Sequence, residues 1–270
     1  QKLALALLNS GSDGLVVVGT TGESPTLTKA EEQRLFTEVK EAVGDKGKVI
    51  AGTGSNNTAE AIIATRAAEQ TGVDACLLVV PYYNKPSQEG LYRHFKAIAE
   101  STSLPCLLYN VPARTIITLK ADTVIRLSEV KNIVGIKEAG GDMDEISRII
   151  ENTPDGFIVL SGNDGDTLPM LQRGADGLIS VASHLVGDQI KEMINSYLNG
   201  NREKAETINN HLLPLYDALF LQANPIPVKY ALNKIGFTVG QPRLPLCEPD
   251  EKTARRIMDT VGKYQIDLPL

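Results

Sequence analysis

Short apolar runs alternate with longer segments of helical character through the first two-thirds of the chain, and this alternation limits the fold more than any other feature. Each run is bounded by glycine, proline or polar residues and is too short for a helix, which is typical of buried strands in a parallel sheet. The runs recur roughly every 20 to 30 residues, so the pattern predicts right-handed βαβ units. Seven runs are found, at 15–18, 49–51, 76–80, 105–109, 133–137, 157–160 and 177–181.

Capping patterns predict where some of the intervening helices begin. Thr28 and Glu31 form a capping box that opens a helix to about residue 43, and Asn57 and Glu60 open another in the same way. Residues 2–8 resemble the last turns of a helix, and further helices are expected at about 88–101, 120–127 and 143–150.

A doubly wound open sheet and a (β/α)8 barrel both fit this alternation, and two observations favour the barrel. Polar, glycine-containing motifs follow nearly every strand, as expected when one rim carries the chemistry. No GxGxxG fingerprint of dinucleotide binding follows the first strand. Because such a barrel has eight strands and the chain begins in a helix-like segment, we expect strand one and the start of helix one to be missing from this sequence.

The strand pattern stops after Val186. Helices are expected instead at 188–199, 201–221, 225–235 and 250–262, with a proline-rich, extended connection before the last one. We therefore predict a (β/α) barrel over residues 1–187 and C-terminal helices packed on it over residues 188–270.

The charge distribution excludes several classes of partner. The 270-residue chain has a net charge of -6, and its 27 lysines and arginines form no block or stripe. Nucleic acid and an anionic membrane surface are therefore not expected partners. No apolar run approaches the length of a membrane span, and no secretory signal pattern opens the chain.

Cysteine and histidine usage predicts neither disulfides nor a metal site. The three cysteines are far apart and two of them lie in apolar strand-like runs, which fits inert thiols in a reducing cytoplasm. The three histidines lack metal-ligand spacing with one another or with the cysteines. These residues are Cys76, Cys106, Cys247, His94, His184 and His211.

Lys137 stands directly after the apolar run 133–136 and before the turn glycines Gly140 and Gly141. A lysine where a strand leaves a core is poorly hydrated, so its pKa should fall, and a neutral amine is a nucleophile toward carbonyls. The alternative is a lysine that simply extends from the strand end to solvent.

Other polar residues are predicted to share this rim. Thr20 and Thr21 belong to a turn that binds a carboxylate or merely satisfies backbone groups. Tyr109 is a proton relay or a core tyrosine, and Arg114 binds a carboxylate or forms a surface ion pair. Tyr83 is an interface aromatic or a site residue. Together these residues describe a site for a small carboxylated carbonyl compound, with Lys137 forming an imine.

Six motifs that carry these residues closely resemble the dihydrodipicolinate synthase family, in order along the whole chain. Several are shared with related pyruvate-dependent aldolases such as the sialic acid lyases, whereas Thr21 and Arg114 resemble the synthases alone. The motifs are GTTGES at 19–24, YYNKPSQEG at 82–90, YNVPART at 109–115, GIKE at 135–138, SGND at 161–164 and NPIPVK at 224–229.

The resemblance implies a role for each site residue. It implies that Lys137 forms a Schiff base with pyruvate, and that Arg114 binds the carboxylate of L-aspartate 4-semialdehyde. It implies a proton relay of Tyr109, Thr21 and Tyr83, with Tyr83 reaching in from a neighbouring subunit. Residues implied to shape the pyruvate pocket are Thr20, Gly162 and Ile179.

The resemblance also implies a setting for the enzyme. It implies a cytoplasmic homotetramer, built as a dimer of dimers, that makes 4-hydroxy-tetrahydrodipicolinate for lysine and diaminopimelate synthesis. It implies no metal and no organic cofactor, because the imine of Lys137 serves as the electron sink.

A regulatory lysine site is implied less fully. The residues that match the family's inhibitory site are Ser24, Asn56, Glu60 and Tyr82. Lysine-sensitive members tend to carry histidine at two positions that are Lys29 and Glu32 here. Because a cation at Lys29 would repel a bound lysine ammonium, we expect weak or absent feedback inhibition.

Two other functions remain open at this stage. One is another pyruvate-dependent aldolase or lyase on the same fold. The other is a catalytically crippled, N-terminally truncated barrel that serves for binding or regulation, since loss of one strand would leave two unpaired edges.

Overall fold

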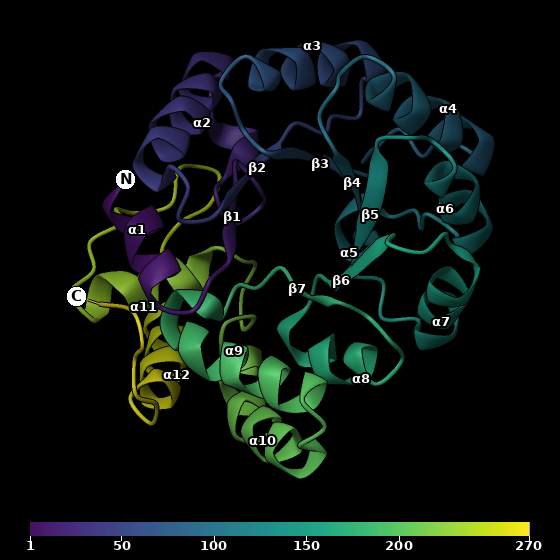
Figure 1. The fold of residues 1–270 in the computed structure, drawn as a ribbon. Helices are drawn as coiled ribbons and strands as arrows, with labels where there is room; N and C mark the ends of the chain where they lie inside the picture. Colours follow the sequence, from purple (N-terminus) through teal and green to yellow (C-terminus); the bar gives the residue numbers. More distant parts are fainter. Residues whose placement is uncertain (270) are drawn as a thin grey trace.

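The computed structural model describes residues 1–269 and shows, within them, a seven-stranded parallel sheet whose strands pair in sequence order. The strands curve around a common axis and the helices surround them on the outside (Figure 1). The predicted parallel α/β architecture is confirmed. The strands are β1 (Gly14–Val17), β2 (Lys48–Gly52), β3 (Ala75–Val79), β4 (Cys106–Asn110), β5 (Ile133–Glu138), β6 (Ile158–Ser161) and β7 (Gly177–Leu178).

The outer helices begin where local capping favours them. Thr28 and Glu31 form the predicted capping box, and the Asn57 side chain accepts hydrogen bonds from Ala59 and Glu60 N–H. The helices are α2 (Lys29–Val43), α3 (Thr58–Glu69), α4 (Gln88–Ala99), α6 (Ala121–Ser128), α7 (Met143–Asn152) and α8 (Thr167–Leu171). The sequence did not predict the short α5 (Pro112–Thr115).

Alternation along each strand separates two environments, because successive side chains of a strand point to opposite faces. One set of strand residues, including Leu78, Leu108 and Ile136, packs with the outer helices in the main core. The neighbouring set, including Leu77 and Tyr109, forms a smaller cluster on the concave face. Residues one position apart on the same strand therefore belong either to the core or to the enclosed space.

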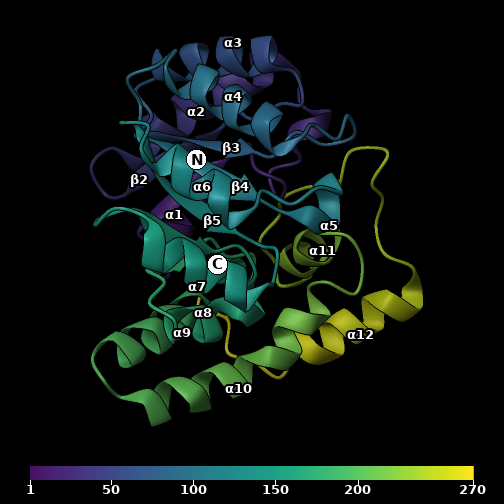
Figure 2. The ribbon, with the colours of Figure 1, turned by 90° about the vertical axis from the view of Figure 1, so that its right-hand side faces the viewer.

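Four helices form the C-terminal region, which lies along one side of the molecule (Figure 2). They share a second core with α1 (Lys2–Asn9) and the segment after β7. The predicted boundary at 187/188 falls inside α9, which begins at Ser183 and kinks at Val186. The helices are α9 (Ser183–Leu198), α10 (Arg202–Ala218), α11 (Ile226–Lys234) and α12 (Glu251–Val261).

The last strand is shorter than predicted, since β7 ends at Leu178 and only one further backbone bond, from Ile179 N–H to the Ser161 carbonyl, continues its pairing. Within residues 1–269, β1 and β7 are the two edges of the sheet and do not pair with each other. A cavity of about 1920 Å³ reaches from the carboxyl ends of the strands to both edge strands. None of the helices in the described part of the chain is long and apolar enough to cross a bilayer.

Candidate active site

Tyr109 and Lys137 face each other across neighbouring strands at the carboxyl end of the sheet. They are register partners on β4 and β5, so the sheet itself brings them together from positions far apart in the sequence. The Lys137 ammonium nitrogen lies 4.4 Å from the centroid of the Tyr109 ring. Both side chains line the cavity, which is the arrangement expected of the chemical end of a parallel α/β sheet.

The environment of Lys137 favours a neutral amine. Burial lowers the pKa of Lys137 to about 8, opposed by the Asp164 carboxylate and assisted by the Arg114 guanidinium. At pH 7 about one molecule in ten then carries a neutral amine, against about one in three thousand for an ordinary lysine. The nucleophile predicted from the strand-end position is therefore chemically plausible in this fold.

The two threonines after β1 differ in what they contact. Burial raises the pKa of Tyr109, whereas the Arg114 guanidinium and a hydrogen bond with the Thr20 hydroxyl lower it. The Thr21 hydroxyl instead accepts a hydrogen bond from Asn224 Nδ2 at 2.9 Å. Thr20 therefore acts on the Tyr109 phenol, while the Thr21 hydroxyl is engaged by Asn224.

Arg114 lies at the mouth of the cavity, on the short helix α5 that follows β4. Its guanidinium donates a hydrogen bond to the Asn224 carbonyl at 3.1 Å, and Asn224 in turn holds Thr21. The side chain is otherwise exposed, which leaves donors available for an anionic group. Asn224 occurs in one of the recognised motifs, but the sequence suggested no role for it.

Gly162 and Ile179 both line the cavity, and their backbone N–H groups are already used. Gly162 N–H donates to the Glu138 carbonyl at 2.7 Å, and Ile179 N–H donates to the Ser161 carbonyl at 2.9 Å. Neither N–H group is therefore left to bind a carboxylate. A Cβ atom at Gly162 would come within 3.1 Å of Lys137 Cε, so glycine keeps space for the lysine side chain.

Tyr83 is not brought to the site by its own chain. It lies in the loop after β3, is 85% exposed, and has a positive φ of 76°, which is uncommon outside glycine. Its neighbour Tyr82 lines the cavity, but Tyr83 is not among the residues that line it. Within the described residues of a single chain, Tyr83 is therefore an exposed loop residue outside the cavity.

The predicted regulatory residues gather at one margin of the same cavity. Ser24, Glu60 and Tyr82 line it, and Asn56 Nδ2 donates a hydrogen bond to the Tyr82 carbonyl at 3.0 Å. Lys29 and Glu32 line this margin too and form an ion pair of 2.9 Å.

Three buried polar residues near the lysine had no role predicted for them. Glu138 and Asn110 follow Lys137 and Tyr109 on their strands, and Asp164 follows β6; they are 4%, 2% and 2% exposed. Asp164 accepts hydrogen bonds from the Ser180 hydroxyl and from two backbone N–H groups after β7. They could have been noticed in the sequence because each is a charged or amide residue within two positions of a candidate site residue.

The described residues contain no cluster of three or more His, Cys, Asp or Glu side chains that could hold a metal ion. The fold and site thus define a parallel α/β protein with a lysine of lowered pKa facing a tyrosine at the carboxyl ends of its strands.

Comparison with known proteins identifies the family. The chain belongs to the dihydrodipicolinate synthetase family, which it matches over residues 1–264. It is 65% identical over 270 residues to 4-hydroxy-tetrahydrodipicolinate synthase of Dehalococcoides mccartyi strain CBDB1, covering 100% of this chain and 91% of the relative.

Solved structures agree with this assignment. Dihydrodipicolinate synthase from Bacillus anthracis superposes with a TM-score of 0.95 at 50% identity, covering 97% of this chain and 90% of that one. The enzyme from Cyanidioschyzon merolae, solved with lysine bound, has a TM-score of 0.94 at 46% identity and the same coverage of 97% and 90%.

Proposed function

We propose that this chain is a 4-hydroxy-tetrahydrodipicolinate synthase, a lyase-class enzyme that condenses pyruvate with L-aspartate 4-semialdehyde in lysine and diaminopimelate synthesis. The environment of Lys137 carries the proposal. Burial lowers the pKa of Lys137 to about 8, and its side-chain nitrogen lies 4.4 Å from the centroid of the Tyr109 ring. Relatives at up to 65% identity over the full chain bear this enzyme's name.

Imine formation at Lys137 starts the reaction. The neutral amine attacks the keto carbon of pyruvate to give a carbinolamine, and loss of water from it leaves a protonated imine. The imine withdraws electrons, so the methyl group gives up a proton and an enamine forms. Burial of the lysine assists the first attack, because it raises the fraction of neutral amine.

Proton transfer at this centre is assigned to Tyr109 and Thr20. The Tyr109 phenol is buried beside the lysine, and the Thr20 hydroxyl lowers the pKa of Tyr109, so we propose that these two hydroxyls carry a proton to and from the carbinolamine. We propose that Tyr83 of a neighbouring subunit completes the relay, since in its own chain this residue is 85% exposed. A homotetramer, arranged as a dimer of dimers, is therefore part of the proposal.

The second substrate is assigned to the mouth of the cavity. The exposed guanidinium of Arg114, anchored through the Asn224 carbonyl, suits a carboxylate of L-aspartate 4-semialdehyde. The enamine carbon then attacks the aldehyde, and the substrate's amine closes the ring on the imine carbon and displaces the Lys137 amine. Every step moves protons and electron pairs among the substrates and these side chains, so the proposal includes no metal or organic cofactor.

Two assays with one enzyme preparation test the assignment. Pyruvate with L-aspartate 4-semialdehyde should give the condensation product, whereas N-acetylneuraminate should not be cleaved. The reverse outcome would support a related pyruvate lyase, and inactivity toward both would support a non-catalytic role for this chain.

Weak lysine feedback is a further part of the proposal. Lys29 lines the same cavity as Ser24, Glu60 and Tyr82 and is held by its ion pair with Glu32, so a positive charge stands on this cavity and would repel the ammonium group of a bound lysine. We expect little inhibition by lysine and stronger inhibition in Lys29→His. Strong inhibition of the unmodified enzyme at sub-millimolar lysine would contradict this.

We also propose that the sheet is part of a closed (β/α)8 barrel in a cytoplasmic enzyme, with residues 188–270 forming a helical appendage. The cavity that reaches both β1 and β7 supports this, because a further strand there would pair both edges. Hydrogen exchange of the β1 and β7 backbone amides tests this. Slow exchange along both strands would support a closed barrel, and fast exchange at these edges would count against it.

A further inference from the structure

Glu138 is a buried carboxylate placed directly after Lys137 but on the opposite face of β5. Its two oxygens accept hydrogen bonds from Asn110 Nδ2 at 2.9 and 3.1 Å, and Oε1 also accepts one from Gly140 N–H at 2.6 Å. Asn110 is its register partner on β4. This pair thus links the two strands one residue beyond the Tyr109 and Lys137 pair.

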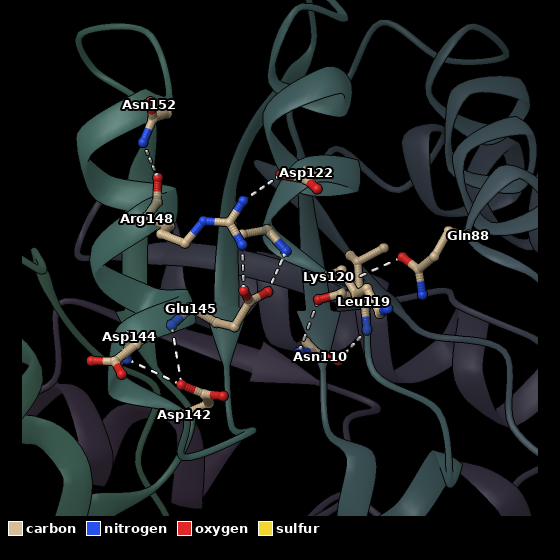
Figure 3. A network of polar contacts seen from close by, with 11 residues as sticks. Gln88, Asn110, Leu119, Lys120, Asp122, Asp142, Asp144, Glu145, Arg148 and Asn152 are labelled. Carbon is tan, nitrogen blue, oxygen red and sulfur yellow. Dashed lines mark hydrogen bonds and ion pairs between the residues drawn. The ribbon is translucent and has the colours of Figure 1, made fainter.

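Asn110 is itself held on both sides of its amide. Its Oδ1 accepts a hydrogen bond from Leu119 N–H at 3.0 Å, and its Nδ2 lies 3.4 Å from the Leu119 carbonyl. Figure 3 shows Asn110 against this segment, whose next residue, Lys120, donates its N–H to Gln88 Oε1 at 3.1 Å. The amide is therefore fixed by the chain in front of α6, and the carboxylate is fixed by the amide.

We propose that Glu138 is a positioning residue of this enzyme, whose carboxylate, held by Asn110 and Gly140, fixes the register that presents Lys137 to Tyr109. The function of the pair depends on the ionised form. All of its partners donate hydrogen bonds, so a proton on the carboxyl group would leave one donor without an acceptor.

The surroundings of Glu138 make this ionisation relevant near neutral pH. Burial raises the pKa of Glu138 to about 7, and the Glu145 carboxylate of α7 adds to this effect, while the hydrogen bonds from Asn110 and Gly140 oppose it. The other titratable groups nearby are Tyr109 on β4 and Lys137 on its own strand. From β6 the register partner is the neutral Ser161, and α6 presents the buried side chains Ala121, Thr123, Val124 and Leu127.

The test measures the rate at which cyanoborohydride traps pyruvate on Lys137, read by intact mass between pH 5.5 and 9. If both a neutral Lys137 and an ionised Glu138 are needed, the logarithm of the rate should rise with a slope of two below about pH 7 and of one between about pH 7 and 8, and should level off above about pH 8. In Glu138→Gln we expect the rate at pH 8 to fall at least about tenfold and the slope to be one below about pH 8, with the same plateau above it.

Two further variants separate positioning from stability. In Gly140→Ala the new methyl carbon would come within 2.7 Å of Glu138 Oε1 and would displace the carboxylate. This variant should therefore lower the trapping rate, as Glu138→Gln does, without removing a titratable group. Asp74→Asn is the matched control, because Asp74 also joins two strands through a backbone N–H but lies at the opposite end of the sheet. It should lower the melting temperature and leave the slope of two unchanged.

This inference rests on the proposed function, and one added measurement keeps the two apart. Acetylation of Lys137 by acetic anhydride, followed by peptide mass mapping, reports the lysine without pyruvate. Absence of trapping in the unmodified enzyme would refute imine formation, while a shift of the acetylation profile to higher pH in Glu138→Gln and Gly140→Ala would still support positioning. Trapping rates within twofold of the unmodified enzyme in both variants, with unshifted acetylation profiles, would overturn it.

Discussion

Carboxylates join neighbouring strands at both ends of the sheet, but their hydrogen-bond donors differ: one end includes a lysine and the other has only neutral donors. At the amino end, Asp74 accepts a hydrogen bond from Val49 N–H at 2.9 Å and forms an ion pair of 2.7 Å with Lys40. Asp176 repeats the backbone part of this arrangement, accepting one from Val159 N–H at 2.8 Å. At the carboxyl end, Glu138 joins β4 and β5 through neutral donors alone.

The pKa values of the two groups follow from this difference. Burial alone would raise the pKa of Asp74, but the hydrogen bond from Lys40 and the backbone bond from Val49 outweigh it and lower the pKa. The pKa of Glu138 is raised to about 7 because burial is not offset by a cation. One end of the sheet therefore contributes stability, and the other holds groups that change protonation near neutral pH.

Replacement of the nucleophile should give the largest effect and should act on chemistry alone. In Lys137→Ala we expect turnover to fall by at least about a thousandfold, because the amine that forms the imine is removed. Since the change removes a buried, partly charged group, the melting temperature should not fall. Steady-state kinetics and thermal unfolding measure the two parts, and retained turnover would contradict the assignment.

The two threonines after β1 give the next largest contrast. Thr20→Val removes the hydroxyl that lowers the pKa of Tyr109 and should lower turnover by about tenfold to a thousandfold. Thr21→Val removes only the acceptor of the Asn224 amide and should cost a few-fold at most. The ratio of the two turnover numbers is the measurement, and a larger loss in Thr21→Val would restore the original sequence-based assignment.

The dependence of stability on pH should have opposite signs at the two ends. Because the folded pKa of Glu138 lies above the unfolded value, its contribution to stability is present below about pH 4.5 and is lost as pH rises through about 7. The unmodified protein should therefore lose up to about 3 kcal/mol relative to Glu138→Gln between pH 4.5 and 7. Denaturant unfolding across this range measures it, and parallel curves would count against the raised pKa.

Asp74→Asn should give the smallest effect. The pKa of Asp74 is lower in the folded protein than in the unfolded one. Its ionised carboxylate therefore stabilises the fold at pH values above the unfolded pKa, and this contribution is lost as the pH falls through the folded pKa. We expect a loss of about 1 kcal/mol at pH 7, with turnover unchanged. Denaturant unfolding at pH 7 and pH 3 should show that the difference in unfolding free energy between the unmodified protein and Asp74→Asn shrinks in acid. A loss of turnover in Asp74→Asn would contradict a purely stabilising role for this end of the sheet.

The sequence was sufficient for features that depend on local pattern. The alternation of apolar runs predicted the parallel sheet, and the capping box at Thr28 predicted the start of α2. Lys137 could be selected because a strand-end lysine is chemically unusual. The start of α9 at Ser183 and the end of β7 at Leu178 were missed, since both depend on packing against the C-terminal helices.

Features that depend on side-chain direction could not be predicted from sequence. Thr20 and Thr21 are adjacent in a turn that follows Val18, whose positive φ of 61° redirects the chain and is unexpected for a β-branched residue. The pairing of Glu138 with Asn110 spans 28 residues and arises only when β4 and β5 come into register.

Peptide mapping of the pyruvate adduct tests the proposed chemistry most directly. The enzyme would be incubated with pyruvate at pH 8, reduced with borohydride, digested and analysed by mass spectrometry. We expect one reduced adduct, on the peptide that contains Lys137, and none in Lys137→Ala. No adduct, or an adduct on another lysine, would contradict a Schiff-base mechanism at the Lys137 and Tyr109 pair.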